Sequence, residues 1–191
     1  MRMPHFLIAM LLLMVANTSR ADDTSSNTQG PHPGAAMQSL IKALSGRWAV
    51  TGSFEPGSET PKGGAIFGEQ TWRAGPGGFT FMQEEDLHTP MGEMLGTGFM
   101  WWDQSRGFAG LRCLNFDPKD CDVAGSSRIS FKWDGKELVI DFASSKDATK
   151  IAWHEVFSDI TPGGFTQTGY SGHATGDLTK ALTIHATRIR Q

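Results

Sequence analysis

The sequence predicts an all-β protein: a single closed antiparallel up-and-down barrel of about ten strands with a short N-terminal helix. Three observations lead to this prediction: short segments with a period of two, turn signals between them, and frequent glycine and tryptophan. Glycine accounts for 23 of 191 residues and tryptophan for 6, a mixture that suits tight turns between aromatic strands. Because closure removes exposed sheet edges, a barrel is expected for so many short strands.

A short amphipathic run opens the predicted barrel domain, which spans residues 37–191. Apolar side chains recur there at helical spacing, at Met37, Leu40, Ile41 and Leu44. Gly46 ends the run, as glycine commonly does after a helix. We expect a helix that leads into the barrel as a lid or plug.

Ten segments follow in which the period changes to two, and each is predicted as a strand. They span 46–54, 65–73, 79–87, 95–103, 107–115, 127–133, 137–144, 150–158, 165–173 and 181–190. Turn signals such as Gly75-Pro76-Gly77-Gly78 and Asp134-Gly135 separate them. Because the connections are short and lack helical periodicity, consecutive strands are expected to pair as antiparallel neighbours.

Residues 1–21 have the layout of a secretory signal peptide. Arg2 precedes the apolar stretch 6–16, and the small residues Ser19 and Ala21 follow. The apolar stretch is about eleven residues long, shorter than the roughly 18 to 20 that a membrane-spanning helix needs. We therefore expect cleavage after Ala21, a periplasmic or secreted protein, and no stable membrane insertion after cleavage.

Residues 22–36 are predicted to be a flexible leader. The stretch 22–34 has no large apolar residue whose burial could offset the entropy of ordering. The remaining length is normal for one domain. The formal charge is −3 with both signs scattered along the chain, so nucleic acid and anionic membrane surfaces are not expected partners.

Two cysteines, Cys113 and Cys121, flank a predicted connection between strands. In an oxidising compartment we expect a disulfide between them across that loop. By the chain-entropy model, closing so short a loop contributes roughly 2 to 3 kcal/mol. The alternative is a reactive or metal-binding thiol pair, which needs a shorter spacing and neighbouring histidines.

At Leu44-Ser45-Gly46-Arg47-Trp48 the chain resembles the opening of the lipocalin and calycin superfamily, a short helix followed by Gly-x-Trp on the first strand. In that superfamily the tryptophan packs at the closed end of the barrel beneath an arginine from the last strand. The resemblance therefore assigns structural roles to Gly46 and Trp48. It makes Arg188 or Arg190 the matching cation, stacked over the indole.

A wider similarity covers roughly residues 40–190 and resembles the bacterial family called Domain of Unknown Function 1579. It rests on Gly46-Arg47-Trp48, Gly68 to Trp72, Gly77-Gly78, Pro90-Met91-Gly92, Gly96-x-Gly98 before Trp101-Trp102-Asp103, and the hairpin from Trp133 to Leu138. This resemblance implies a calycin-like barrel that is often exported. It implies no established activity and no fixed catalytic residues.

The leading functional hypothesis is non-enzymatic binding of a small apolar or amphipathic molecule inside the barrel, with no cofactor. Its aromatic walls are expected from Trp72, Phe99, Trp101 and Trp153. Arg112 and Glu155 share the parity of apolar neighbours on their strands, so burial would require them to pair with each other or with a ligand. Tyr170 is a further hydroxyl donor for this cluster. The alternative is that the barrel mouth keeps these side chains in water.

Three other functions stay open from the sequence. His185 is a candidate haem ligand, because small haem-binding barrels of the nitrobindin type resemble this architecture and place a histidine late in the chain. The simpler interpretation puts His185 on the outer face. An enzyme could use Glu155 with His154 or Tyr170. A packed barrel could instead dock a partner protein through an outer aromatic patch.

Two other groups of ionisable residues give no site by sequence. His88, His154 and His173 lack the spacing that gathers metal ligands. In Glu84-Glu85-Asp86 the adjacent side chains of a strand point to opposite faces, so Glu84 and Asp86 share a face without Glu85. A solvated strand face is the expected account of this acidic run.

Overall fold

The structure, a computed structural model, describes residues 33–58, 60–103, 107–115, 129–144, 147, 149–172 and 176–190. The predicted signal peptide and most of the predicted leader lie outside these ranges. Among the residues that are described, no helix has both the length and the apolar character needed to cross a bilayer.

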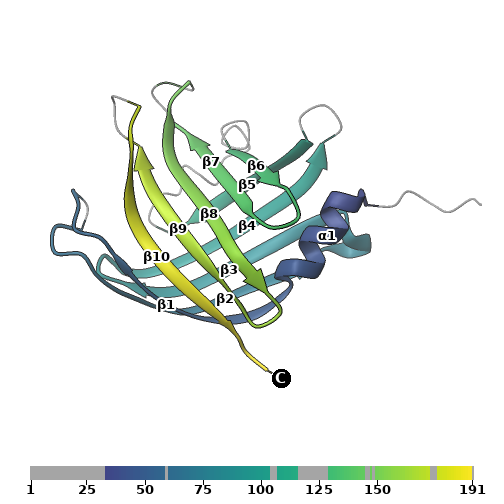
Figure 1. Cartoon of the computed structure of the whole chain (residues 1–191), viewed down its shortest axis with the longest axis horizontal. Helices are drawn as coiled ribbons and strands as arrows, with labels where there is room; N and C mark the ends of the chain where they lie inside the picture. Colours follow the sequence, from purple (N-terminus) through teal and green to yellow (C-terminus); the bar gives the residue numbers. More distant parts are fainter. Residues whose placement is uncertain are drawn as a thin grey trace, which may run out of the picture. The chain divides into compact units, whose positions relative to one another are not determined.

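Ten antiparallel strands form one sheet in the order β5-β4-β3-β2-β1-β10-β9-β8-β7-β6 (Figure 1). The strands are β1 (Gly46–Phe54), β2 (Gly64–Ala74), β3 (Thr80–Thr89), β4 (Gly92–Asp103), β5 (Gly107–Leu114), β6 (Ile129–Trp133), β7 (Leu138–Ala143), β8 (Ile151–Thr161), β9 (Gly164–Gly172) and β10 (Leu178–Arg188). Each overlaps its predicted segment with ends within three residues, and β1 pairs with β10. The predicted up-and-down barrel is confirmed.

The barrel is nearly closed, and its seam lies between β5 and β6. These strands touch, but their described residues share no hydrogen-bonded ladder. Side chains close the seam instead: Gly110 of β5 leaves space for the ring of Phe131 of β6, and a Cβ at Gly110 would lie 2.6 Å from Phe131 Cε2. Cys121 lies between these strands, outside the described residues, so its disulfide with Cys113 stays a prediction.

Helix α1 (Ala35–Leu44) covers one end of the barrel, against β2, β3, β8 and the short 3-10 helix η1 (Pro76–Gly78) (Figure 1). It begins two residues before the predicted start at residue 37. Its apolar face is fully buried, through Met37, Leu40 and Leu44. The expectation of a plug helix is confirmed, because this face completes the core at the closed end.

An arginine from the last strand, Arg188, contacts three residues at the closed end of the barrel. The guanidinium carbon of Arg188 lies 4.0 Å from the ring centroid of Trp48. The same guanidinium donates to the carbonyl oxygens of Ser45 at 2.7 Å and Pro162 at 2.6 Å. A Cβ at Gly46 would overlap Arg188 Nη1. The structural roles that the sequence assigned to Gly46, Trp48 and Arg188 are therefore confirmed.

Aromatic rings fill the interior next to α1. The ring centroids of Trp48 and Phe165 are 5.0 Å apart, and those of Trp72 and Phe157 are 5.5 Å apart, both edge to face. Phe81 lies 5.3 Å from Trp72 by the same measure. Edge-to-face pairs such as Trp48–Phe165 and Trp72–Phe157 add stability beyond the area they bury. These rings and the buried residues of α1 belong to one hydrophobic core cluster.

Replacing Arg188 by methionine is expected to lower the free energy of unfolding by about 2 kcal/mol, because a cation–π contact and two charge-assisted hydrogen bonds are lost. Urea denaturation measures the change. The matched control is Arg73→Met, since Arg73 pairs with Glu84 at 2.9 Å on the half-exposed outer face and such pairs contribute roughly 0 to 1 kcal/mol. Equal losses in the two variants would contradict the assigned role of Arg188.

Candidate functional site

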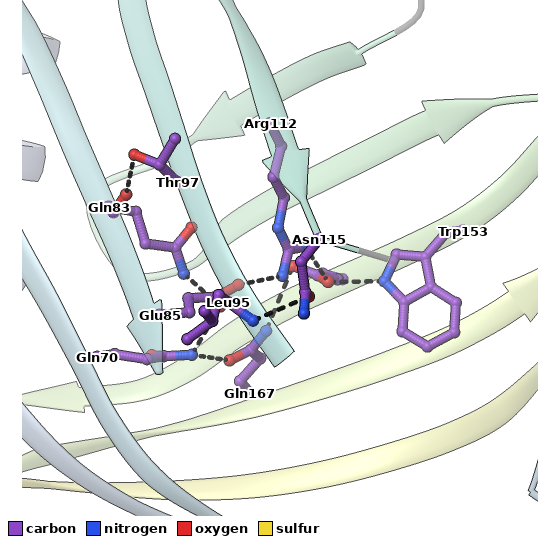
Figure 2. A network of polar contacts seen from close by, with 10 residues as sticks. Gln70, Gln83, Glu85, Leu95, Thr97, Arg112, Asn115, Trp153 and Gln167 are labelled. Atoms are coloured by element: carbon purple, nitrogen blue, oxygen red, sulfur yellow. Dashed lines mark hydrogen bonds and ion pairs between the residues drawn. The ribbon is translucent and has the colours of Figure 1, made fainter. Parts of the chain in front are cut away.

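A network of polar side chains crosses the interior of the barrel (Figure 2). We call it the polar layer, and it consists of Gln70, Gln83, Glu85, Arg112, Glu155 and Gln167, each at most 8% exposed. Core residues flank it along the strands: on β3, Phe81 and Leu87 lie on either side of the layer. Buried polar groups of this density are held by hydrogen bonds or they destabilise the fold.

Arg112 bridges two buried carboxylates at the centre of the layer. Its Nη2 donates to Glu85 Oε2 at 2.6 Å and its Nη1 donates to Glu155 Oε1 at 2.7 Å. Burial disfavours the charged guanidinium, but the carboxylates of Glu155 and Glu85 outweigh this and raise the pKa of Arg112 above its ordinary value. The predicted pairing of Arg112 with Glu155 is confirmed, and Glu85 is an unpredicted second partner.

Amide and indole donors complete the coordination of both carboxylates. Glu85 Oε1 accepts from Gln70 Nε2 at 3.0 Å and from Gln83 Nε2 at 2.8 Å. Glu155 accepts from Trp153 Nε1 at 2.6 Å through Oε1 and from Gln167 Nε2 at 3.3 Å through Oε2. Every carboxylate oxygen in the layer therefore accepts at least one N–H.

Three buried polar atoms near the layer have no hydrogen-bond partner among the described residues: Gln70 Oε1, Trp72 Nε1 and Arg112 Nε. Trp72 and Arg112 border one small interior space of about 10 Å³. Its remaining walls are Phe81, Gln83, Gly98, Phe99, Met100, Leu111, Phe131, Ile140 and Phe142. As it stands the space suits about one water molecule. Two residues that have unpartnered N–H donors therefore line a largely apolar space.

A second cavity, of about 100 Å³, lies where β8, β9 and β10 meet the connection between β1 and β2. We call it the mouth pocket; it is lined by Phe54, Glu55, Pro56, Gly57, Ser58, Thr60, Trp153, Ser171, Thr179, Lys180 and Ala181. Trp153 belongs to its wall and also donates to Glu155. This indole therefore connects the mouth pocket to the polar layer.

Of the four aromatic residues predicted to line the interior, two point into the barrel and two point to the outer face. Trp72 is buried inside the barrel, and Trp153 contacts the core from the interior. Phe99 and Trp101 flank Met100, whose side chain lies in the core, so alternation along β4 directs both of them to the outer face. The prediction that Phe99 and Trp101 form inner walls is wrong, although Phe99 borders the small space.

Tyr170 lies on the outer face and does not join the polar layer. Its ring contacts His154 at 5.5 Å between centroids, and His154 Nδ1 lies 2.6 Å from Asp141 Oδ1. On β8 the side chain of Glu155 points inward while that of His154 points outward. The prediction that Tyr170 supports Arg112 is therefore wrong. An enzyme that combines Glu155 with His154 or Tyr170 lacks the necessary geometry, because the sheet separates these groups.

His185 is exposed on the outer face of β10, between the core residues Ile184 and Ala186. Its Nδ1 lies 3.5 Å from Thr166 Oγ1. The alternative of a haem ligand inside the barrel at His185 is therefore wrong. His173 lies outside the described residues, and within the ranges described no three His, Cys, Asp or Glu side chains gather into a metal site.

Sequence reasoning missed Glu85 and the three glutamines. Their signal was parity: Gln70 lies two residues before Trp72, Gln167 two after Phe165, and Glu85 two before Leu87. Glu84 behaves as expected of a solvated face, because it pairs with Arg73. The middle residue of the acidic run was the informative one, because it alone points inward.

Removing the central cation should destabilise the fold strongly. We expect Arg112→Met to lose roughly 3 to 5 kcal/mol in neutral buffer, because two buried carboxylates lose their shared partner. Denaturant titration measures this loss, with Arg47→Met as the control. Arg47 pairs with Glu69 at 2.6 Å on the half-exposed surface, so a comparable loss in both variants would refute the role of Arg112.

Comparison with solved structures places the fold among known barrels. No family model and no curated protein matches the chain. The crystal structure of Rv2717c from M. tuberculosis is similar with a TM-score of 0.55 and 13% identity, over 83% of this chain and 99% of that one. The S-type phycobiliprotein lyase CPES from Guillardia theta matches with a TM-score of 0.51 and 8% identity, over 81% and 93%. At these identities the likeness shows the fold alone.

Proposed function

We propose that this protein binds a small amphipathic molecule inside its barrel, against the polar layer, without catalysing a reaction. The observation that carries the proposal is the pair of unpartnered N–H donors, Trp72 Nε1 and Arg112 Nε, whose side chains border one interior space. A buried donor without a partner costs roughly 1 to 3 kcal/mol. A ligand oxygen that accepts from both donors recovers that cost.

The walls of the space suit the rest of such a ligand. Phe81, Met100, Phe131 and Phe142 surround the two donors with aromatic and thioether surface. Small-molecule sites commonly combine such apolar walls with a few fixed polar groups that orient the ligand. The polar end of the ligand is therefore expected at Trp72 and Arg112, with its apolar body among the aromatic rings.

The barrel must widen to admit the ligand, because the present space is about 10 Å³. The space spans the seam, since Arg112 belongs to β5 and Phe131 belongs to β6. No ladder joins these strands among their described residues, so widening there breaks side-chain contacts and leaves backbone hydrogen bonds intact. We propose the seam as the route by which the ligand enters.

We also propose that the protein acts outside the cytoplasm and belongs to the Domain of Unknown Function 1579 family. The signal-peptide layout of residues 1–21 supports export. The glycine and tryptophan motifs of residues 40–190 support the family assignment, and the shared barrel fold is compatible with it.

Native mass spectrometry of the exported protein tests the binding proposal. We expect an additional mass, close to one per chain, that denaturation releases and solvent extraction identifies. Trp72→Phe removes the indole donor and retains an aromatic ring, so the variant should carry less of this molecule. Trp102→Phe is the control, because Trp102 is 46% exposed and lies outside the lining of the space. Equal occupancy of the two variants would contradict the assigned role of Trp72.

A further inference from the structure

The charge of the polar layer is unbalanced. One guanidinium, that of Arg112, faces the two carboxylates of Glu85 and Glu155 at 2.6 and 2.7 Å. All three side chains are at most 10% exposed, so water screens the imbalance weakly. At their formal charges, two carboxylates and one guanidinium give the layer an excess of one negative charge.

Both terminal nitrogens of the Arg112 guanidinium already bind carboxylates. Each of them donates an N–H, one to Glu155 and the other to Glu85, and Nε is the guanidinium nitrogen that has no partner among the described residues. A buried arginine in a barrel by itself suggests a ligand carboxylate, which would bind through the forked nitrogens. Here both terminal nitrogens already donate to carboxylates, and a ligand anion would lie beside an already negative cluster.

The free groups at the space discriminate against cations as well. Trp72 and Arg112, which line the space, each have an unpartnered N–H donor, whereas the unpartnered acceptor, Gln70 Oε1, belongs to a residue outside the lining. An ammonium group has donors only. It would be attracted by the net charge but would place its own N–H groups against those of Trp72 and Arg112.

We infer that the site selects a ligand with an uncharged acceptor oxygen, a carbonyl or hydroxyl oxygen, over both carboxylates and ammonium ions. This inference rests on the proposed function, because it names the ligand class of the same site. The negative charge of the layer disfavours the anion, and the two unpartnered N–H donors disfavour the cation. An uncharged oxygen satisfies both donors and adds no charge to a buried cluster.

Three probes with the same phenyl body separate the alternatives: acetophenone, benzoate and benzylammonium. Each is titrated into the full protein while the indole N–H signals are followed by nuclear magnetic resonance, with the Trp72 signal assigned through Trp72→Phe. We expect acetophenone to shift the Trp72 signal and to bind at least about tenfold more tightly than either charged probe. Trp102 supplies an internal reference signal away from the space.

The second part of the experiment changes the charge of the polar layer. Glu85→Gln removes the excess negative charge and retains an acceptor for Arg112. The affinity for benzoate should therefore rise relative to the affinity for acetophenone. Glu155→Gln makes the same change from the other side of Arg112, should the first variant fail to fold. Glu69→Gln is the control, because Glu69 is half exposed and pairs with Arg47 on the surface, and it should leave the preference unchanged.

The possible outcomes are distinct. Tighter binding of benzoate or benzylammonium, with a shift of the Trp72 signal, overturns the inference about ligand class and leaves the proposed binding function standing. An unchanged preference in both Glu85→Gln and Glu155→Gln also overturns it. No shift of the Trp72 signal with any probe at millimolar concentration refutes the proposed function itself.

Discussion

The ion pair of Arg112 with Glu155 connects the two sides of the seam between β5 and β6, whose described residues share no backbone ladder. Arg112 lies on β5 at one side of the seam, and Glu155 lies on β8, which reaches the other side through β7 and β6. Glu85 extends the link to β3. The guanidinium thus joins the two ends of the sheet through the interior, where Phe131 and Gly110 close the contact between neighbouring strands.

This link has an energetic cost. Taking a guanidinium and two carboxylates out of water is expensive, and well-packed apolar residues often give an equally stable or more stable core. What the network supplies is directionality, because each of Gln70, Gln83, Gln167 and Trp153 must approach a carboxylate along a hydrogen-bonding direction. Such a network defines one arrangement of the strands, whereas a purely apolar core would allow several arrangements.

The sequence predicted the architecture well because turns and alternation are local signals. The strand positions and the plug helix followed from residues whose chemistry is visible in a short window. The contact between Trp48 and Arg188 was implied only by the resemblance to the lipocalin and calycin superfamily. Face assignment was harder, because a period of two shows which residues share a face without showing which face is inside. The predictions for Phe99, Trp101 and Tyr170 were wrong because they placed these side chains on the inner face. Glu85 was overlooked because its neighbours Glu84 and Asp86 made the run look uniformly solvated.

The pairing of β1 with β10 has a consequence for how the chain folds. Trp48 lies opposite Arg188 in this ladder, so the first and last strands of the barrel meet only when the whole domain is available. Contacts between such distant segments carry a loop-closure cost and slow folding. During synthesis the edge of β1 stays unpaired until β10 emerges, and open strand edges invite association with other chains. A chain that stops short of β10 would therefore be a hazard for aggregation, even with nine of its ten strands complete.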